Sequence, residues 1–252
     1  MQYPHGSQPI STYLSLFILR KVRDNSLQIH WLLGVIIFCC FLASCSKEEL
    51  SSEQQQFENE MTAAMADARV YGPITQGFAI EVAERYNGRV TELNYKTRES
   101  ATRKCITDKC RPYDLKDLAR TTIVAGWDSM EIKPIIHYLV VAASAHGFFK
   151  RYKHQSSDYG YWGDLVNLEF GRLSTEIQIK TYGMFYASYP ADISQSVLGD
   201  SIYTVIRTKS GVEPGLSHYY YEIMRADTSS AATVEHYKQL AIKYHALFEH
   251  IR

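Results

Sequence analysis

The sequence lacks the short motifs that mark most enzymes and cofactor-binding proteins. It has no Gly-x-Ser-x-Gly elbow, no glycine-rich phosphate loop and no His-Glu-x-x-His metal pair. Two of the nine histidines, His137 and His146, lie in one apolar segment, but nine residues on a helix make about 2.5 turns and place them on nearly opposite faces. From these absences we expect no catalytic motif, no metal site and no cofactor.

An excess of charge of either sign is also missing. The chain has 27 Lys and Arg residues and 27 Asp and Glu residues. Three basic residues and one acidic residue precede Cys45, so residues 45–252 have a formal charge of −2. Because nucleic-acid binding usually needs a basic patch, this balance argues against a nucleic-acid partner.

Long apolar runs are absent as well. The most apolar stretch, residues 31–43, is shorter than the roughly 20 residues that a membrane-spanning helix needs. A basic stretch precedes it, and it runs into the sequence Leu42-Ala43-Ser44-Cys45. This order of parts resembles a bacterial lipoprotein signal peptide. The alternatives are an uncleaved signal anchor and a buried apolar helix.

The resemblance implies that residues 1–44 are a removable signal peptide and that Cys45 is lipidated. Acyl chains on Cys45, palmitate among them, would then hold the protein on a membrane, since two or more chains anchor stably. Ser46 favours the outer membrane over the inner, with the protein facing the periplasm. Residues 45–56 are polar and read as a tether to the folded domain.

Cysteine is scarce in the rest of the chain. Of five cysteines, two precede the lipidation sequence, so Cys105 and Cys110 are the pair left beyond Cys45. An oxidising periplasm would bridge such a pair, and closing this short loop would stabilise the fold by about 2 kcal/mol. The alternative, a metal or redox site, lacks a second cysteine pair or a nearby histidine. We therefore predict a structural disulfide.

The apolar spacing indicates helices over most of residues 57–252. Helical spacing from Phe57 runs to Gly72-Pro73, where we expect the helix to end. Residues 77–100 suit a helix, although Asn87-Gly88 equally suits a hairpin. We expect residues 103–112 to be a surface connector and a short helix to follow near Asp114.

Further helices are expected towards the C-terminus. Asp128 and Glu131 resemble a capping box ahead of an apolar-periodic helix that ends near Gly147. Residues 154–163 are expected to be a loop, and residues 166–184 a helix, although residues 175–181 also alternate like a strand. A last helix with a cap in residues 227–230 completes the set. The prediction is one mainly α domain, an irregular bundle of six or seven helices, with a small hairpin as the local alternative.

Tyrosine is abundant, with 19 in the chain. Because tyrosine covers apolar area and keeps a polar tip, it collects on binding surfaces, although packing in the core is the ordinary explanation. If residues 219–221 are helical, three successive tyrosines point about 100° apart, so at least one should be exposed. The partner-binding candidates are Tyr159, Tyr161, Trp162, Tyr219, Tyr220 and Tyr221.

These features favour a non-enzymatic binding protein with a periplasmic protein partner. The sharpest version is an immunity or inhibitor lipoprotein that neutralises a toxic effector, and the first alternative is an assembly factor or pilotin-like lipoprotein of an envelope secretion system. The second alternative is a cell-wall hydrolase. It would use Glu169 and Glu176, which lie seven residues apart and would share one face of a helix.

Overall fold

The computed structural model describes residues 51–226, 229–249 and 251, and residues 53–252 form a single compact unit. The predicted signal peptide and Cys45 lie outside the described residues. No helix in the described part of the chain is both long enough and apolar enough to span a membrane. The elements in order are α3 (Ser52–Arg85), β1 (Arg89–Val90), β2 (Asn94–Tyr95), α4 (Arg98–Asp108), the 3₁₀ turn η2 (Pro112–Asp114), β3 (Ala119–Val124), α5 (Ser129–Ala145), β4 (Phe149–Ser156), β5 (Trp162–Phe170), β6 (Leu173–Lys180), α6 (Tyr182–Ser188), α7 (Ala191–Ser210), α8 (Leu216–Met224) and α9 (Ala231–Ala246).

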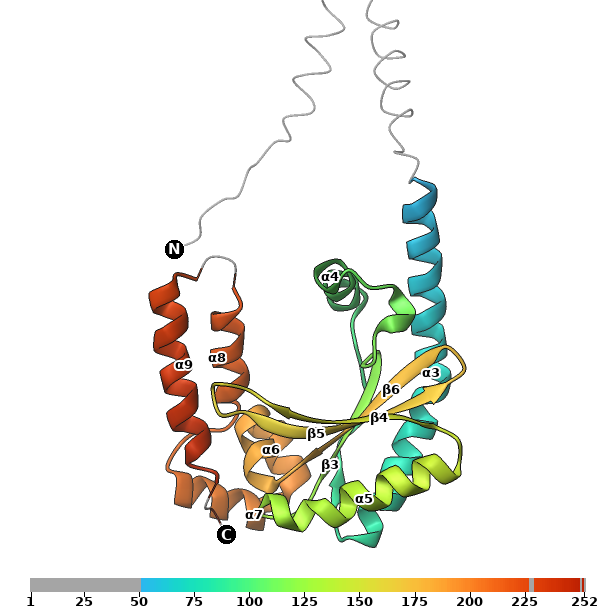
Figure 1. The fold of residues 1–252 in the computed structure, drawn as a ribbon. Helices are drawn as coiled ribbons and strands as arrows, with labels where there is room; N and C mark the ends of the chain where they lie inside the picture. The colour runs from blue at the N-terminus through green and yellow to red at the C-terminus, as the bar shows by residue number, and fades with distance from the viewer. Residues whose placement is uncertain (1–50, 227–228, 250, 252) are drawn as a thin grey trace, which may run out of the picture. The chain divides into compact units, whose positions relative to one another are not determined.

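A six-stranded mixed sheet forms the centre of the molecule (Figure 1). The strand order is β1-β3-β6-β5-β4, and β2 also pairs with β3. Strands β3 and β6 run parallel with Arg120 opposite Glu176, while the other pairs are antiparallel. The fold is therefore α/β, and the prediction of a mainly α bundle was wrong.

The β5–β6 hairpin replaces the helix predicted over residues 166–184. Val166, Leu168 and Phe170 alternate towards one face, and Leu173 pairs with Phe170 after the turn. Gly171 in that turn has φ +61, which glycine adopts readily. The helical spacing that we noted was a coincidence of two short strands, each of which fits a period of two better.

The long helix α3 continues through the Gly72-Pro73 pair that we expected to end it. Gly72 serves close packing instead, because a Cβ there would lie 2.9 Å from a methyl carbon of Leu93. The helix also begins at Ser52, inside the segment predicted as a tether. It ends at Arg85, and the Asn87-Gly88 turn leads into β1, so residues 77–100 are part helix and part strand.

Other local predictions had mixed outcomes. Helix α5 is confirmed: Asp128 caps it by accepting from the amides of Met130 and Glu131. Helix α9 is confirmed too, with Ser230 as its N-cap. The predicted connector at residues 103–112 is wrong because α4 occupies most of it, and the predicted loop at residues 154–163 is wrong because β4 and β5 leave only residues 157–161 as the turn.

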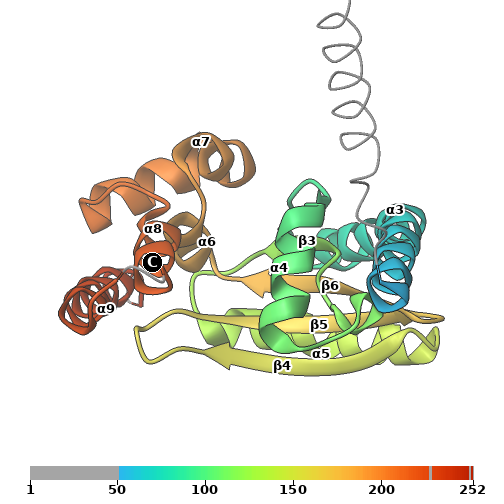
Figure 2. The same cartoon turned by 90° about the horizontal axis from the view of Figure 1, so that it is seen from above.

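The two faces of the sheet differ in what covers them. Helix α5 packs on one face together with the C-terminal half of α3, and α4 lies on the opposite side (Figures 1 and 2). Helices α6 to α9 gather at the end of the sheet around a second apolar cluster that includes Val124. The face away from α5 carries the polar side chains described next.

Candidate functional site

Buried polar side chains line the sheet face away from α5. Side chains alternate along a strand, so the isoleucines of β3 and β6 point into the core and their neighbours point away. On β5 and β6, these neighbours are buried although they are polar or charged: Asn167, Ser174, Glu176 and Lys180. Buried ionisable groups are rare without partners, and they mark this face as a candidate site.

Lys180 is the least expected of these residues. Its ammonium lies 5.0 Å from the ring centre of Tyr161 and 5.1 Å from that of Tyr189, and the side chain is only 4% exposed. Within the described residues, no hydrogen bond or ion pair reaches this ammonium. Burial lowers its pKa, and the positive charge of Arg120 acts in the same direction. The ring faces compensate only part of the lost hydration, so the site favours an added anion.

Arg120 on β3 and Glu176 on β6 share the face of the sheet that carries Lys180. They are register partners of the parallel β3–β6 pair, so both point to the same face. Glu176 is buried and accepts a hydrogen bond of 2.9 Å from the side-chain amide of Gln178. No ion pair joins either residue to another group in the part of the chain described. This face therefore presents two cations and one carboxylate that no internal partner neutralises.

A second charged cluster joins α4 to the start of β3. Asp117 accepts from Lys96 at 2.7 Å and from Lys104 at 3.1 Å, one lysine on each carboxylate oxygen. Burial opposes ionisation of Asp117, but the two ammonium groups outweigh it and hold the pKa of this carboxyl below its ordinary value. One carboxylate thus fixes two lysines, and the cluster keeps a net positive charge.

The chemistry of this face suits phosphate groups. Lysine and arginine bind phosphate oxygens through charge-assisted hydrogen bonds, and fixed cations stabilise charge that moves during phosphoryl transfer. Glu176 can accept a proton, because its carboxylate is not used by a cation. Burial raises the pKa of Tyr161 to about 12, so its ring stays neutral. Among the described residues, no group of three or more His, Cys, Asp or Glu side chains is placed to hold a metal ion.

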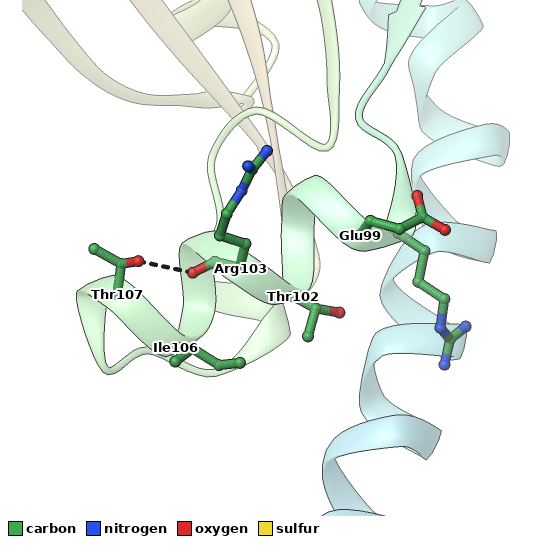
Figure 3. Close-up of a pocket in the computed structure, with 6 residues that line it drawn as sticks. Glu99, Thr102, Arg103, Ile106 and Thr107 are labelled. Carbon is green, nitrogen blue, oxygen red and sulfur yellow. Dashed lines mark hydrogen bonds between the residues drawn. The ribbon is translucent and has the colours of Figure 1, made fainter. Parts of the chain in front are cut away.

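A shallow depression elsewhere on the surface is a weaker candidate (Figure 3). Its lining comes from one helix, α4, and includes Ile106, which is 70% exposed. Arg98 at its edge already binds Glu58 of α3. The depression has no buried ionisable group, so we place the candidate site on the sheet.

The predicted aromatic candidates fall in two places. Tyr161 lies at the site over Lys180, whereas Trp162 packs against the core on the other face. In α8, Tyr219 is 54% exposed and Tyr221 39%, which confirms that the three tyrosines cannot share one core. Tyr159 lies near the tyrosines of α8, because its ring centre is 6.4 Å from that of Tyr221.

Cys105 and Cys110 lie close together at the end of α4. Their sulfur atoms are 3.5 Å apart as free thiols, compared with about 2.05 Å in a disulfide. Burial and the hydrogen bond from Cys110 raise the pKa of Cys105 to about 12. The disulfide stays a prediction.

Glu169 and Glu176 are not paired on a helix as the hydrolase hypothesis required. Glu169 lies on β5, is exposed and binds Lys150, whereas Glu176 lies buried on β6. Our sequence reasoning missed Arg120 and Lys180, which share the sheet face of Glu176, and the charged cluster of Lys96, Lys104 and Asp117. One signal was available: residues 176–180 alternate polar side chains with isoleucine.

Comparisons with known proteins identify similar enzymes. No family model matches the chain. Over 147 residues, which are 57% of this chain, it is 31% identical to the (p)ppApp synthetase toxin Tas1 of Pseudomonas aeruginosa (strain UCBPP-PA14). The match covers 32% of that relative, so the chain spans about a third of its length.

Solved structures are similar to this chain as well. The type VI effector Tas1, in complex with its immunity protein, superposes with a TM-score of 0.55 and 24% identity over 77% of this chain and 95% of that one. A GTP pyrophosphokinase family protein from Streptococcus pneumoniae gives 0.40 and 16% over 81% and 94%. The first of these establishes likeness of fold, and that structure holds the effector bound to a protein partner.

These findings correct the expected function. The sequence match is to a synthetase toxin, so the expectation of a non-enzymatic immunity or assembly lipoprotein was wrong. The alternative of a peptidoglycan hydrolase that uses Glu169 and Glu176 was wrong as well. Both errors began with the absence of short motifs, because the charged groups of this site come from separate elements and form no compact motif.

Proposed function

We propose that this chain is a toxin enzyme that makes phosphorylated adenosine nucleotides of the (p)ppApp type. Such a product carries phosphate groups on two positions of adenosine, so its synthesis needs a phosphorylated acceptor and a donor of diphosphate. The sequence match to Tas1 supports this reading. The observation that carries it is Lys180, a buried ammonium that lies between two tyrosine rings and forms no ion pair with any carboxylate of the described chain.

The cations of the site bind the phosphates in this proposal. Lys180 and Arg120 reach the same face of the sheet, and the pair Lys96 and Lys104 adds positive charge from the side of α4. Cations that are fixed before the substrate arrives need no reorganisation when charge shifts towards the leaving group. Asp117 supplies that fixation for the two lysines.

Glu176 acts as the general base. The acceptor hydroxyl oxygen attacks the β-phosphorus of a nucleoside triphosphate, the bond from that phosphorus to the oxygen of the α-phosphate breaks, and a nucleoside monophosphate leaves. The proton of the hydroxyl passes to Glu176.

The test is a synthesis assay with the full chain in detergent. ATP is mixed with AMP, ADP or ATP as acceptor, with GDP in parallel, and the products are separated by anion-exchange chromatography. We expect adenosine products with additional phosphate in wild type and none in Glu176→Gln. Folded protein that forms no such product from any acceptor would rule the proposal out.

A protein partner fits the same proposal. Because the similar effector was solved with its immunity protein, we propose that a cognate inhibitor binds this chain and protects the cell that makes it. Expression in the cytoplasm of a bacterial host, without residues 1–44 and without the inhibitor, should stop growth, and co-expression of the inhibitor should restore it. A Glu176→Gln variant that stays equally toxic would contradict the link between toxicity and synthesis.

We also propose that the chain is exported and lipid-anchored through Cys45, on the side of the envelope that faces the periplasm, with the outer membrane favoured by Ser46. The support is the sequence Leu42-Ala43-Ser44-Cys45 after an apolar stretch. Export would also separate a nucleotide-consuming enzyme from the nucleotides of its producer. Palmitate labelling should be lost in Cys45→Ala, and unchanged labelling would refute the anchor.

A further inference from the structure

The turn between β4 and β5, residues 157–161, is held from outside the sheet by α8 and α9. Asp158 forms an ion pair with Lys238 of α9. Gly160 packs directly on α9, because a Cβ added there would lie 3.1 Å from the Cβ of His245. The turn closes on itself through Ser157, whose side-chain oxygen accepts from the Tyr161 amide at 3.1 Å.

His245 makes the central contact. Its side chain is buried, with Nδ1 2.8 Å from the carbonyl oxygen of Tyr159 and Nε2 2.9 Å from the hydroxyl oxygen of Ser217. A carbonyl only accepts, so Nδ1 must carry a proton. Nε2 then accepts the hydroxyl hydrogen of Ser217, and the ring is neutral. Burial lowers the pKa of His245, which agrees with this neutral tautomer.

The contact leads directly to the candidate site. Two residues after the carbonyl that His245 binds, Tyr161 places its ring over the Lys180 ammonium at 5.0 Å. The Tyr161 ring also meets the His245 ring edge to face, with centres 6.1 Å apart. A displacement of the turn would therefore move Tyr161 away from Lys180. The phosphate-binding proposal does not use His245 or Ser217 in any step.

We propose that His245, supported by Ser217, is a positioning residue that fixes the turn at residues 157–161 so that Tyr161 covers Lys180. The C-terminal helices thereby set the geometry of a site to which they contribute no reacting group. The effect on kinetics rests on the proposed function, whereas the effect on the turn does not.

Two amide substitutions separate the two hydrogen bonds of the ring. In His245→Asn the amide nitrogen takes the place of Nδ1 and can still donate to the Tyr159 carbonyl. In His245→Gln the amide lies where Nε2 lay, and that donor is lost. We expect His245→Gln to raise the KM for nucleotide about tenfold, as one such hydrogen bond is worth, with kcat within about threefold, and His245→Asn to resemble wild type.

Gly160→Ala tests the same contact without changing the His245 side chain. The new methyl group meets α9 and should displace the turn, giving the same rise in KM. Gly171→Ala is the matched control, because Gly171 also has positive φ in a hairpin turn but has no atom within 4 Å of an added Cβ. Equal kinetics in the two alanine variants would overturn the inference, as would equal kinetics in His245→Gln and His245→Asn.

Hydrogen exchange of residues 157–161 in the ligand-free full chain keeps the test independent of activity. Exchange should be faster in His245→Gln and Gly160→Ala than in His245→Asn and Gly171→Ala. If wild type makes no product, the proposed function fails and this exchange pattern alone decides the positioning role. Equal exchange in all four variants would refute that role.

Discussion

Both faces of β6 are largely hidden from water, but they are chemically opposite. Ile177 and Ile179 are fully buried in the core beneath α5 and α3, while Glu176 and Lys180 on the other face are 6% and 4% exposed. Packing explains the first pair, because aliphatic side chains gain free energy from burial. For Glu176 and Lys180, burial costs free energy instead, because buried charges without partners are destabilising. Burial therefore marks a core on one face and a site on the other.

The difference between the two faces is tested most directly at Glu176. Glu176→Gln keeps the shape and the hydrogen bond to Gln178 but removes the base, so synthesis should fall about 10²–10⁴-fold with little change in stability. Glu169→Gln, on the same face but exposed and paired with Lys150, is the control and should stay near wild type. A similar loss in both variants would show that the buried position has no special role.

The apolar face should respond in stability and not in chemistry. Leu168 is fully buried under α5, so Leu168→Ala should reduce the free energy of unfolding by about 2–5 kcal/mol. Activity per folded molecule should stay within a few-fold of wild type at low temperature. Urea unfolding and the synthesis assay measure the two effects. Loss of activity in fully folded Leu168→Ala would remove the division between the faces.

A substitution at Lys180 should weaken nucleotide binding without lowering stability, the reverse of the result expected for Leu168→Ala. Lys180→Met removes a cation that would bind phosphate, and the KM for nucleotide should rise about 10–100-fold. The melting temperature should stay the same or increase, since an unpaired buried charge is removed. Lys133→Met on the exposed surface of α5 is the control. A large drop in stability of Lys180→Met would mean that this lysine is structural.

The smallest expected effect is a dependence on pH at His245, which packs near Lys180 and among the rings of Tyr159, Tyr161 and Tyr244. Its folded-state pKa is below the ordinary 6.5, so the unfolded chain takes up a proton first as pH falls. The contribution of neutral His245 to the free energy of unfolding is therefore complete above about pH 6.5 and is lost as pH falls towards the folded-state pKa.

We expect wild type to lose on the order of 1 kcal/mol more than His245→Asn between pH 7.5 and 5.5. Urea unfolding at both pH values measures the difference. Parallel losses in the two proteins would show that His245 is not held in its neutral form. Asp117 does not disturb this test, because its lowered pKa places its titration at more acidic pH.

The sequence allowed helices α5 and α9 to be predicted, but it did not reveal the sheet. Helix α5 has a long apolar period and a capping aspartate, Asp128, which together leave one interpretation. Strands β5 and β6 are short, and Val166, Phe170, Leu173 and Ile177 fit a helical period by chance. Short apolar runs carry too few residues to separate the two periods.

The site was harder to predict than the fold, for a different reason. Lys104 lies in α4, whereas Lys96 follows β2 and Asp117 precedes β3, so the three meet only after α4 packs beside the sheet. Lys180 has no distinguishing neighbour in sequence, since Tyr161 and Tyr189 reach it through the turn and the end of α6. The tyrosine clusters did identify Tyr161, although for protein binding and not for a nucleotide site.

The parallel pairing of β3 and β6 has a consequence for the order of folding. Arg120 and Glu176 become neighbours only after α5, β4 and β5 have formed the connection between them. Pairings between strands far apart in sequence close large loops and form late. Helix α5 and the β5–β6 hairpin can form locally, so we expect the charges of the site to meet late in folding. A chain that crosses a membrane unfolded would therefore be inert until it has refolded on the far side.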